Sequence, residues 1–144
     1  MRFNESLRLR THLAARVLML AALLGACGDD GPTRPDGDVY HATTFEVRMA
    51  GVTTDLLARG ADIDLVLQDD GRTSGRLYVP AFGGEPTFEA SLAGTWTRNG
   101  STVTLDHPAD TFLRDMPFTV RADGALEGEE DFGGEVLRVV LARE

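Results

Sequence analysis

The chain has 144 residues, 42% of them apolar and 26% charged. This length and composition fit one globular domain and exclude a large multidomain enzyme. All 14 basic residues are Arg, set against 23 Asp and Glu, and the formal net charge is −9. Because binding to phosphates needs a basic surface, we expect no nucleic-acid partner.

The first 26 residues have the pattern of an export signal. Residues 1–16 are polar and basic, and residues 17–26 form an uninterrupted run of ten apolar or small residues. As a helix this run would be about 15 Å long, roughly half of the ~30 Å hydrocarbon core of a bilayer. It is too short to span a membrane, so we assign residues 1–26 to a signal peptide.

The end of this segment, Leu24-Gly25-Ala26-Cys27, closely resembles the lipobox of bacterial lipoproteins. The resemblance implies that the chain is cut before Cys27, that its thiol is lipidated and that its new amino group is acylated. The alternative is an ordinary signal peptide followed by an incidental cysteine. Lipidation is favoured because Cys27 is the single cysteine and has no internal disulfide partner in an exported protein. Three acyl chains would hold the protein on a membrane essentially permanently.

Residues 27–38 are predicted to be the lipidated cysteine and a disordered linker. From residue 28 on they are rich in Gly, Pro and Asp and contain no large apolar residue. The acids do not have the spacing of a calcium-binding loop. In Gram-negative lipoproteins an Asp after the lipidated cysteine marks inner-membrane retention; here the residue is Gly28. By that analogy we expect attachment to the outer membrane, facing the periplasm.

Turn signals divide residues 39–144 at short intervals, and long runs with a spacing of 3.6 are missing, which predicts an all-β domain. An Asn99-Gly100 turn would place Trp96 opposite Val103 and Thr97 opposite Thr102, giving one apolar face and one threonine face. We also expect one short helical turn within residues 53–60. The predicted strands are residues 40–50, 61–68, 73–80, 86–98, 101–106, 111–121, 125–131 and 135–143.

Three more turns predict strand register. A loop at residues 69–71 pairs Ile63 with Leu77, and a loop at 122–124 pairs Val120 with Leu126. A turn at Gly133-Gly134 places Leu126 opposite Leu141, Glu129 opposite Arg138 and Glu130 opposite Leu137. The last pair is a mismatch, which indicates a bulge or the rim of a barrel.

Eight sequential antiparallel strands can remove their edges by closing into an up-and-down barrel, and a two-layer β-sandwich is the alternative. The meander order, the triplet Gly94-Thr95-Trp96, the Asp-Gly and Asn-Gly turns and the final strand at 136–141 resemble the small lipocalin-like barrels of bacterial lipoproteins. The resemblance covers most of residues 40–143. It implies a pocket for a lipid or another apolar molecule.

The predicted interior contains the candidate ligand-binding residues Phe88, Trp96, Phe112 and Phe118. Its other members are Leu92, Val103, Met116, Val120, Leu126 and Leu141, and we place Tyr78 outside. These side chains either line a pocket or fill a solid core. The small size of the barrel favours the solid core.

We expect no enzyme and no cofactor, because no cysteine follows Cys27 and no G-x-S-x-G motif occurs. Asp106, His107 and Asp110 could form part of a metal site, but a solvated turn is the preferred interpretation. For the acidic run at 127–131 we prefer a solvated, partly ion-paired face.

Two functions remain open. The first is a lipid-anchored barrel that binds a small apolar ligand at its mouth. The second is a protein-interaction or inhibitor module that contacts an envelope protein through the loop at residues 81–85. That loop contains Phe82 between small residues, and we expect this aromatic ring to be exposed. The sequence predicts no ligand identity, partner identity or oligomeric state.

Overall fold

Residues 37–144 are described by a computed structural model, and ten strands and two short helices follow one another along them. The predicted signal peptide, Cys27 and the linker up to residue 36 lie outside the described residues. The strands are β1 (Asp38–Met49), β2 (Val52–Asp55), β3 (Asp62–Leu67), β4 (Arg72–Val79), β5 (Phe88–Ser91), β6 (Gly94–Asn99), β7 (Thr102–Asp106), β8 (Phe118–Val120), β9 (Leu126–Asp131) and β10 (Glu135–Arg143). The helices are the 3₁₀ turn η1 (Leu57–Arg59) and α1 (Phe112–Asp115). Neither helix of this part of the chain has the length and apolarity needed to cross a membrane.

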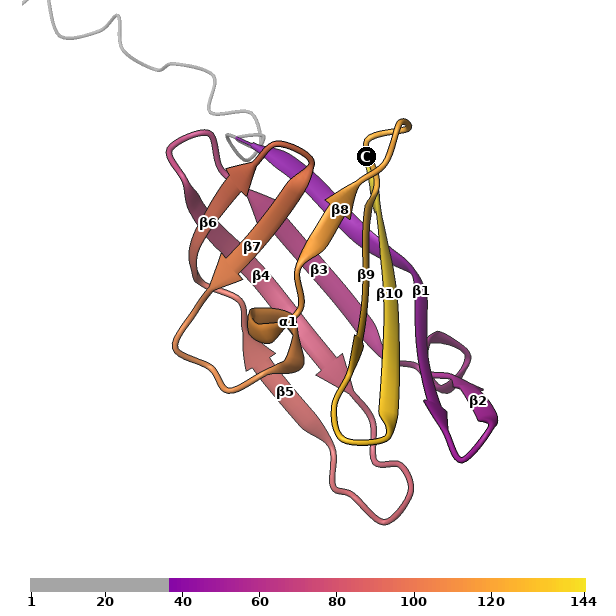
Figure 1. Cartoon of the computed structure of the whole chain (residues 1–144). Coiled ribbons are helices and arrows are strands. Elements are labelled where there is room, and N and C mark those ends of the chain that lie inside the picture. The colour runs from indigo at the N-terminus through magenta and orange to yellow at the C-terminus, as the bar shows by residue number, and fades with distance from the viewer. Residues whose placement is uncertain (1–36) are drawn as a thin grey trace, which may run out of the picture. The chain divides into compact units, whose positions relative to one another are not determined.

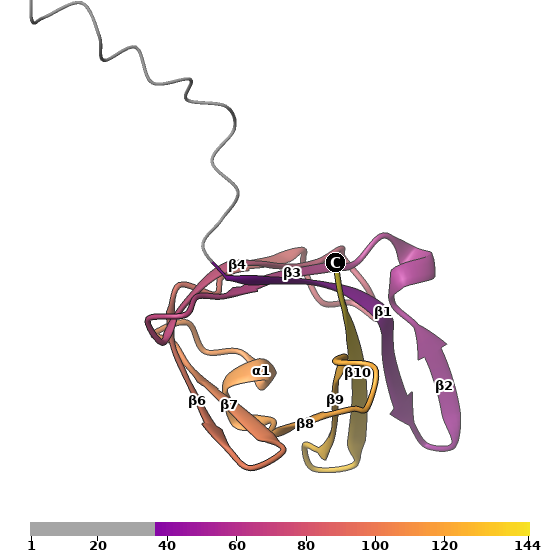
Figure 2. The ribbon, with the colours of Figure 1, turned by 90° about the horizontal axis from the view of Figure 1, so that it is seen from above.

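Eight of the strands close into an antiparallel barrel. Their order is β1-β3-β4-β6-β7-β8-β9-β10, and β10 pairs back with β1 from Tyr40 opposite Arg143 to Met49 opposite Glu135. Figure 1 shows this meander, and Figure 2 shows the strands as a ring. Strands β2 and β5 are additions that pair with β1 and β4. The predicted eight-stranded meander is confirmed, and the closed ring excludes the sandwich.

Three of the four predicted turns have the predicted register. Ile63 lies opposite Leu77, Val120 opposite Leu126, and Glu129 opposite Arg138. The ladder between β9 and β10 is unbroken at Glu130 and Leu137, which excludes a bulge there. The mismatched pair therefore marks the rim of the barrel. The one bulge in the pairing of β1 with β10 lies in β1, between Ala42 and Thr44.

The register of the Asn99-Gly100 hairpin was wrong by two residues. Asn99 pairs with Thr102, so the loop is Gly100-Ser101, and Trp96 lies opposite Leu105. Gly100 has a φ of 62°, and glycine at the first loop position is typical of a type II′ turn. A shift of two keeps every side chain on its own face. The threonine face therefore survives, with the hydroxyls of Thr97 and Thr104 2.8 Å apart.

Two predicted strands are interrupted. The strand predicted at 86–98 divides into β5 and β6, because the ladder with β4 breaks at residues 92–93, where Leu92 turns a fully buried side chain inward. Of the strand predicted at 111–121, only residues 118–120 form a strand, β8, and residues 112–115 form α1. This helix stops at Met116, which is extended because Pro117 disfavours a helical residue before it. The helical turn expected within 53–60 is η1, and it ends at Gly60 with a φ of 92°.

The core fills the barrel at one end. Inward positions of all eight barrel strands contribute apolar side chains at period two, for example Ile63, Leu65 and Leu67 in β3. Tyr78 points outward as predicted, beside Arg76. Loops of two or three residues close the end that holds residues 69–71, 100–101 and 122–124. The longer connections at 80–87 and 107–117 lie at the opposite end, which is the lower end in Figure 1.

Candidate functional site

An open cavity of about 700 Å³ lies at this lower end. Its volume is within the range of about 300–1,000 Å³ typical of small-molecule sites. Most of the lining is apolar, and five aromatic rings contribute to it. The apolar and aromatic lining residues are Phe45, Val47, Met49, Leu56, Val79, Pro80, Phe82, Pro86, Phe88, Phe112, Phe132 and Leu137. The barrel is therefore solid at one end and hollow at the other.

The segment that contains α1 forms one wall of the cavity. Figure 2 shows α1 inside the ring of strands, and Leu113 is fully buried there. The next side chain toward the opening, Phe112, has its ring centroid 5.4 Å from that of Phe45 in β1. It also meets Phe132, in the turn between β9 and β10, edge to face at 6.5 Å. Such pairs contribute about 0.5–1.5 kcal/mol beyond area burial, so the three rings form a stable floor.

The loop between β4 and β5 forms the second wall. Its tip is a tight turn in which Phe82 and Glu85 exchange both backbone hydrogen bonds, at 2.9 and 3.1 Å. Gly83 and Gly84 lie between them with φ values of 62° and 93°, which only glycine adopts readily in succession. Phe82 is half-buried against the core, and the Arg59 guanidinium lies 4.5 Å from its ring centroid. The expectation of an exposed Phe82 was therefore wrong, since its ring packs back onto the barrel.

A buried polar pair stands behind the α1 wall. His107 is only 3% exposed, and its Nε2 lies 3.2 Å from the hydroxyl of Thr111, which lines the cavity. Its Nδ1 is buried and has no hydrogen-bond partner within residues 37–144. The prediction of a solvated turn was wrong for His107, because this residue continues the inward positions Val103 and Leu105 of β7. That period of two was the signal in the sequence.

The rim of the cavity is acidic. Four carboxylates line it, those of Glu85, Asp110, Asp115 and Glu135. Among the described residues, Arg114 pairs with Asp110 at 2.7 Å and with Asp115 at 3.3 Å, whereas Glu85 and Glu135 take part in no ion pair. The cavity thus combines an apolar floor with a few polar groups at its edge, an arrangement suited to binding an apolar molecule.

The four candidate ligand-binding residues lie in three different settings. Phe88 and Phe112 line the cavity, and Phe88 is 43% exposed at its edge. Phe118 is fully buried in the packed end of the core and does not line the cavity. Trp96 is half-buried outside the cavity, and its indole N–H donates to the carbonyl of Gln68 at 2.8 Å. Phe45 and Phe132, which do line it, were missed.

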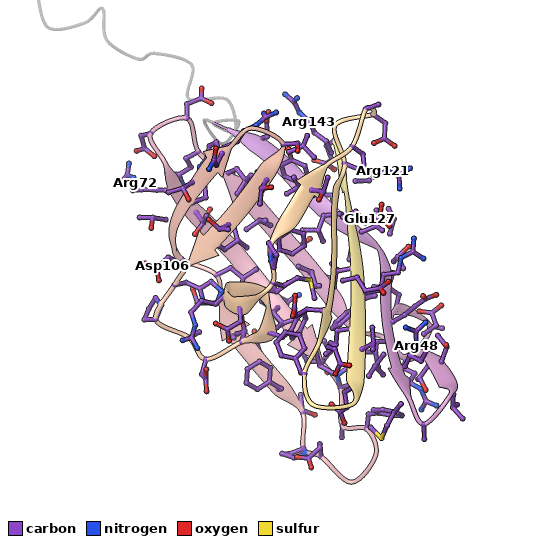
Figure 3. The ribbon with its side chains drawn as sticks, viewed as in Figure 1. Arg48, Arg72, Asp106, Arg121, Glu127 and Arg143 are labelled. Carbon is purple, nitrogen blue, oxygen red and sulfur yellow. The ribbon has the colours of Figure 1, made fainter. Side chains whose placement is uncertain are left out.

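Glu127 and Glu129 of the acidic run on β9 lie on the outer face of the barrel, and the run is partly ion-paired. Glu127 accepts a hydrogen bond from Arg138 at 2.8 Å and lies 3.8 Å from Arg121. The Arg138 guanidinium holds the pKa of the Glu127 carboxyl below its usual value. Arg48, Arg121 and Glu127 project from the outside of the barrel (Figure 3). This matches the prediction of a solvated, partly paired face.

Other charged groups do not assemble into a metal centre. Asp106 and Asp110 are exposed while His107 is buried, and no group of three or more His, Cys, Asp and Glu in residues 37–144 could hold a metal ion. His41 forms a separate cluster at the closed end, with Nδ1 2.6 Å from Asp64 and Nε2 3.0 Å from Glu144. The hydrogen bond to Asp64 is the main reason why the pKa of His41 is raised.

No protein-family model, curated protein or solved structure matches this chain significantly. The fold and the site must therefore be interpreted from their own geometry.

Proposed function

We propose that this protein is a lipid-anchored cell-envelope lipoprotein whose lipocalin-like barrel binds a small apolar ligand in its open end. The cavity of about 700 Å³ at the lower end is the observation that carries the proposal. Its aromatic lining faces this opening, and an apolar ligand there would remove apolar surface from water. The proposed activity is binding and not catalysis.

The membrane anchor rests on the sequence alone, through the resemblance of residues 24–27 to a lipobox. Anchoring would keep the barrel beside a membrane, where apolar molecules concentrate. The chain enters the barrel at Asp38, and the other end of the same strand, at Met49, lines the cavity. Eleven strand steps of roughly 3.3 Å place these points about 35 Å apart along β1. The mouth thus opens at the end of the barrel away from Asp38, the first residue of β1.

Native mass spectrometry tests ligand binding directly. Residues 28–144, which include the whole barrel, would be purified from a periplasm under non-denaturing conditions. We expect an additional mass that organic solvent releases. The variant Phe88→Ala removes a ring from the edge of the cavity and should lower the occupied fraction. Val52→Ala is the matched control, because Val52 is 66% exposed near the same end but does not line the cavity.

Protein interaction is the alternative outcome of this test. A bare mass that stays unchanged after incubation with extracted envelope lipids would contradict ligand binding. The search would then turn to protein partners of the loop at residues 81–85. The half-buried position of Phe82 removes the exposed aromatic ring that had favoured this alternative.

A further inference from the structure

Charge at the mouth of the cavity distinguishes between classes of apolar ligand. We infer that the ligand is a cationic amphiphile, an apolar chain or ring system that carries a positive headgroup, held with its headgroup among the carboxylates of the rim. This inference rests on the proposed function, since it names the chemical class that the same cavity takes.

The first observation is that arginine does not line the mouth. Elsewhere some acids are ion-paired, as in the pairs of Glu127 with Arg138 and of Arg76 with Asp62 and Glu89. At the mouth, four carboxylates line the cavity and, among residues 37–144, no arginine or histidine does. Arg114 forms ion pairs with both Asp110 and Asp115, whereas Glu85 and Glu135 have no ion pair within that part of the chain. Within residues 37–144, two carboxylates therefore line an apolar cavity without an ion-pair partner.

The second observation is where these two acids are placed. Glu85 is held at its position by the paired backbone of the Phe82–Glu85 turn, and Glu135 by its pairing with Met49 at the start of β10. They lie on two different walls, one formed by the loop after β4 and one by the ends of β1 and β10. A cation between these walls would meet carboxylates from both sides, while its apolar part lies over Phe45 and Phe112.

The same charges disfavour an anionic ligand. A fatty-acid carboxylate at this mouth would face four carboxylates, of which only Asp110 and Asp115 are paired with an arginine, and no arginine of residues 37–144 lines the cavity to receive it. The described domain contains 9 Arg and 19 Asp and Glu, and 9 minus 19 gives a net charge of −10 with His neutral. This field attracts cations to the mouth and repels anions from it. A neutral ligand would make no use of the acids.

Three ligands with one chain length test the inference by isothermal titration calorimetry on residues 28–144. The probes are decyltrimethylammonium, 1-decanol and decanoate, all below the concentrations at which they aggregate. We expect the ammonium compound to bind about tenfold more tightly than the alcohol, since two uncompensated carboxylates at twofold to fivefold each multiply to that size. Decanoate should bind most weakly. Added salt should reduce the difference in affinity between the ammonium compound and the alcohol.

Matched variants locate the effect. Glu85→Gln and Glu135→Gln should each weaken ammonium binding about twofold to fivefold and leave alcohol binding unchanged. Both residues are exposed, so the fold should persist, which an unchanged melting temperature would verify. Glu129→Gln is the control, because Glu129 lies on the outer face of β9 and does not line the cavity.

The outcomes separate the two proposals. Equal affinity for ammonium and alcohol, or tighter binding of decanoate, would overturn the cationic ligand and leave an apolar ligand standing. Equal losses in Glu129→Gln and in the rim variants would overturn the role of the rim. Binding of none of the three probes would count against both proposals.

Discussion

Adding a single methyl group at Gly128 tests whether the Met116 side chain, directly after α1, packs inside the barrel against β9. Gly128 faces inward from β9. A Cβ at this position would lie 2.5 Å from Sδ of Met116 and 3.1 Å from Cδ1 of Phe118. Met116 directly follows α1 and is 1% exposed, so its side chain has little room to move. The contact therefore depends on the Met116 side chain, which follows α1, lying over β9 inside the barrel.

The expected cost has two opposing parts. Replacing glycine by alanine in a strand stabilises by about 0.5–1 kcal/mol, and overpacking destabilises by about 1–3 kcal/mol. We expect Gly128→Ala to lower the free energy of unfolding by about 1–2 kcal/mol. For a domain of this size that corresponds to roughly 4–16 °C in melting temperature. Urea denaturation followed by circular dichroism measures the change, provided that the slope with denaturant is the same in both proteins.

A double-mutant cycle identifies Met116 as the cause. Met116→Ala alone should cost about 2–5 kcal/mol through the space it leaves. In that background the new methyl group at residue 128 meets empty space, so Gly128→Ala should become neutral or slightly stabilising. The expected coupling is about 1–3 kcal/mol.

The control cycle combines Gly128→Ala with Ile63→Val in β3, which lies three strands away round the ring. This pair should be additive within about 0.5 kcal/mol. If Gly128→Ala costs the same whether residue 116 is Met or Ala, the Met116 side chain does not lie over Gly128. The packing described for this part of the core would then be incorrect.

Three further predictions concern other parts of the chain. His41→Gln should lower the melting temperature at pH 5.5 by an amount equivalent to about 0.5–1 kcal/mol. The raised pKa of His41 contributes stability below its unfolded value, near pH 6.5, and this contribution is lost as the pH rises through the folded pKa, so wild type and variant should converge by pH 9. Gly94→Ala should cost roughly 3 kcal/mol, because its Cβ would overlap the carbonyl oxygen of Asp106 and lie 2.8 Å from Cβ of His107. Gly133→Ala is the comparison: its Cβ would lie in open space at a φ of 79°, so it should cost only about 1 kcal/mol. Urea denaturation of the two variants measures the difference, and comparable midpoints would contradict the close approach at Gly94. Cys27→Ser should leave the protein uncleaved and absent from the membrane fraction on immunoblots, and unchanged fractionation would refute lipidation.

Strand register could be predicted where a short loop contains glycine at a position that needs positive φ. The loops at 69–71 and 122–124 and the Gly133-Gly134 turn each leave one way to align the flanking apolar residues. At Asn99-Gly100 two alignments keep the same faces together, and only the backbone decides between them. The error there was two residues and not one, because a slip of one would have turned Trp96 outward.

The helix α1 could not be predicted by the same reasoning. Phe112, Met116, Phe118 and Val120 recur at even spacing, which satisfies a strand pattern as far as Val120. All four side chains do point inward, but Phe112 does so from a helix that lies across the ring. Whether residues 112–115 form a helix or a strand depends on the space available inside the closed barrel, and this space is set by all eight strands together. The only local sign was Pro117, which stops the helix but does not indicate that one has begun.

A residue pattern likewise does not predict whether an inward aromatic residue fills the core or lines a cavity. Phe118 and Phe112 have the same side chain and both point inward. Phe118 is fully buried in the core, whereas Phe112 lines the open cavity. The difference lies in their positions along the barrel. Phe118 pairs with Val103 within the ladder of β7 and β8, whereas Phe112 belongs to the long connection at 107–117, at the same end as the connection at 80–87. The Gly133-Gly134 turn lies at this open end too and is as short as the loops at the closed end, so connection length alone does not predict which end opens.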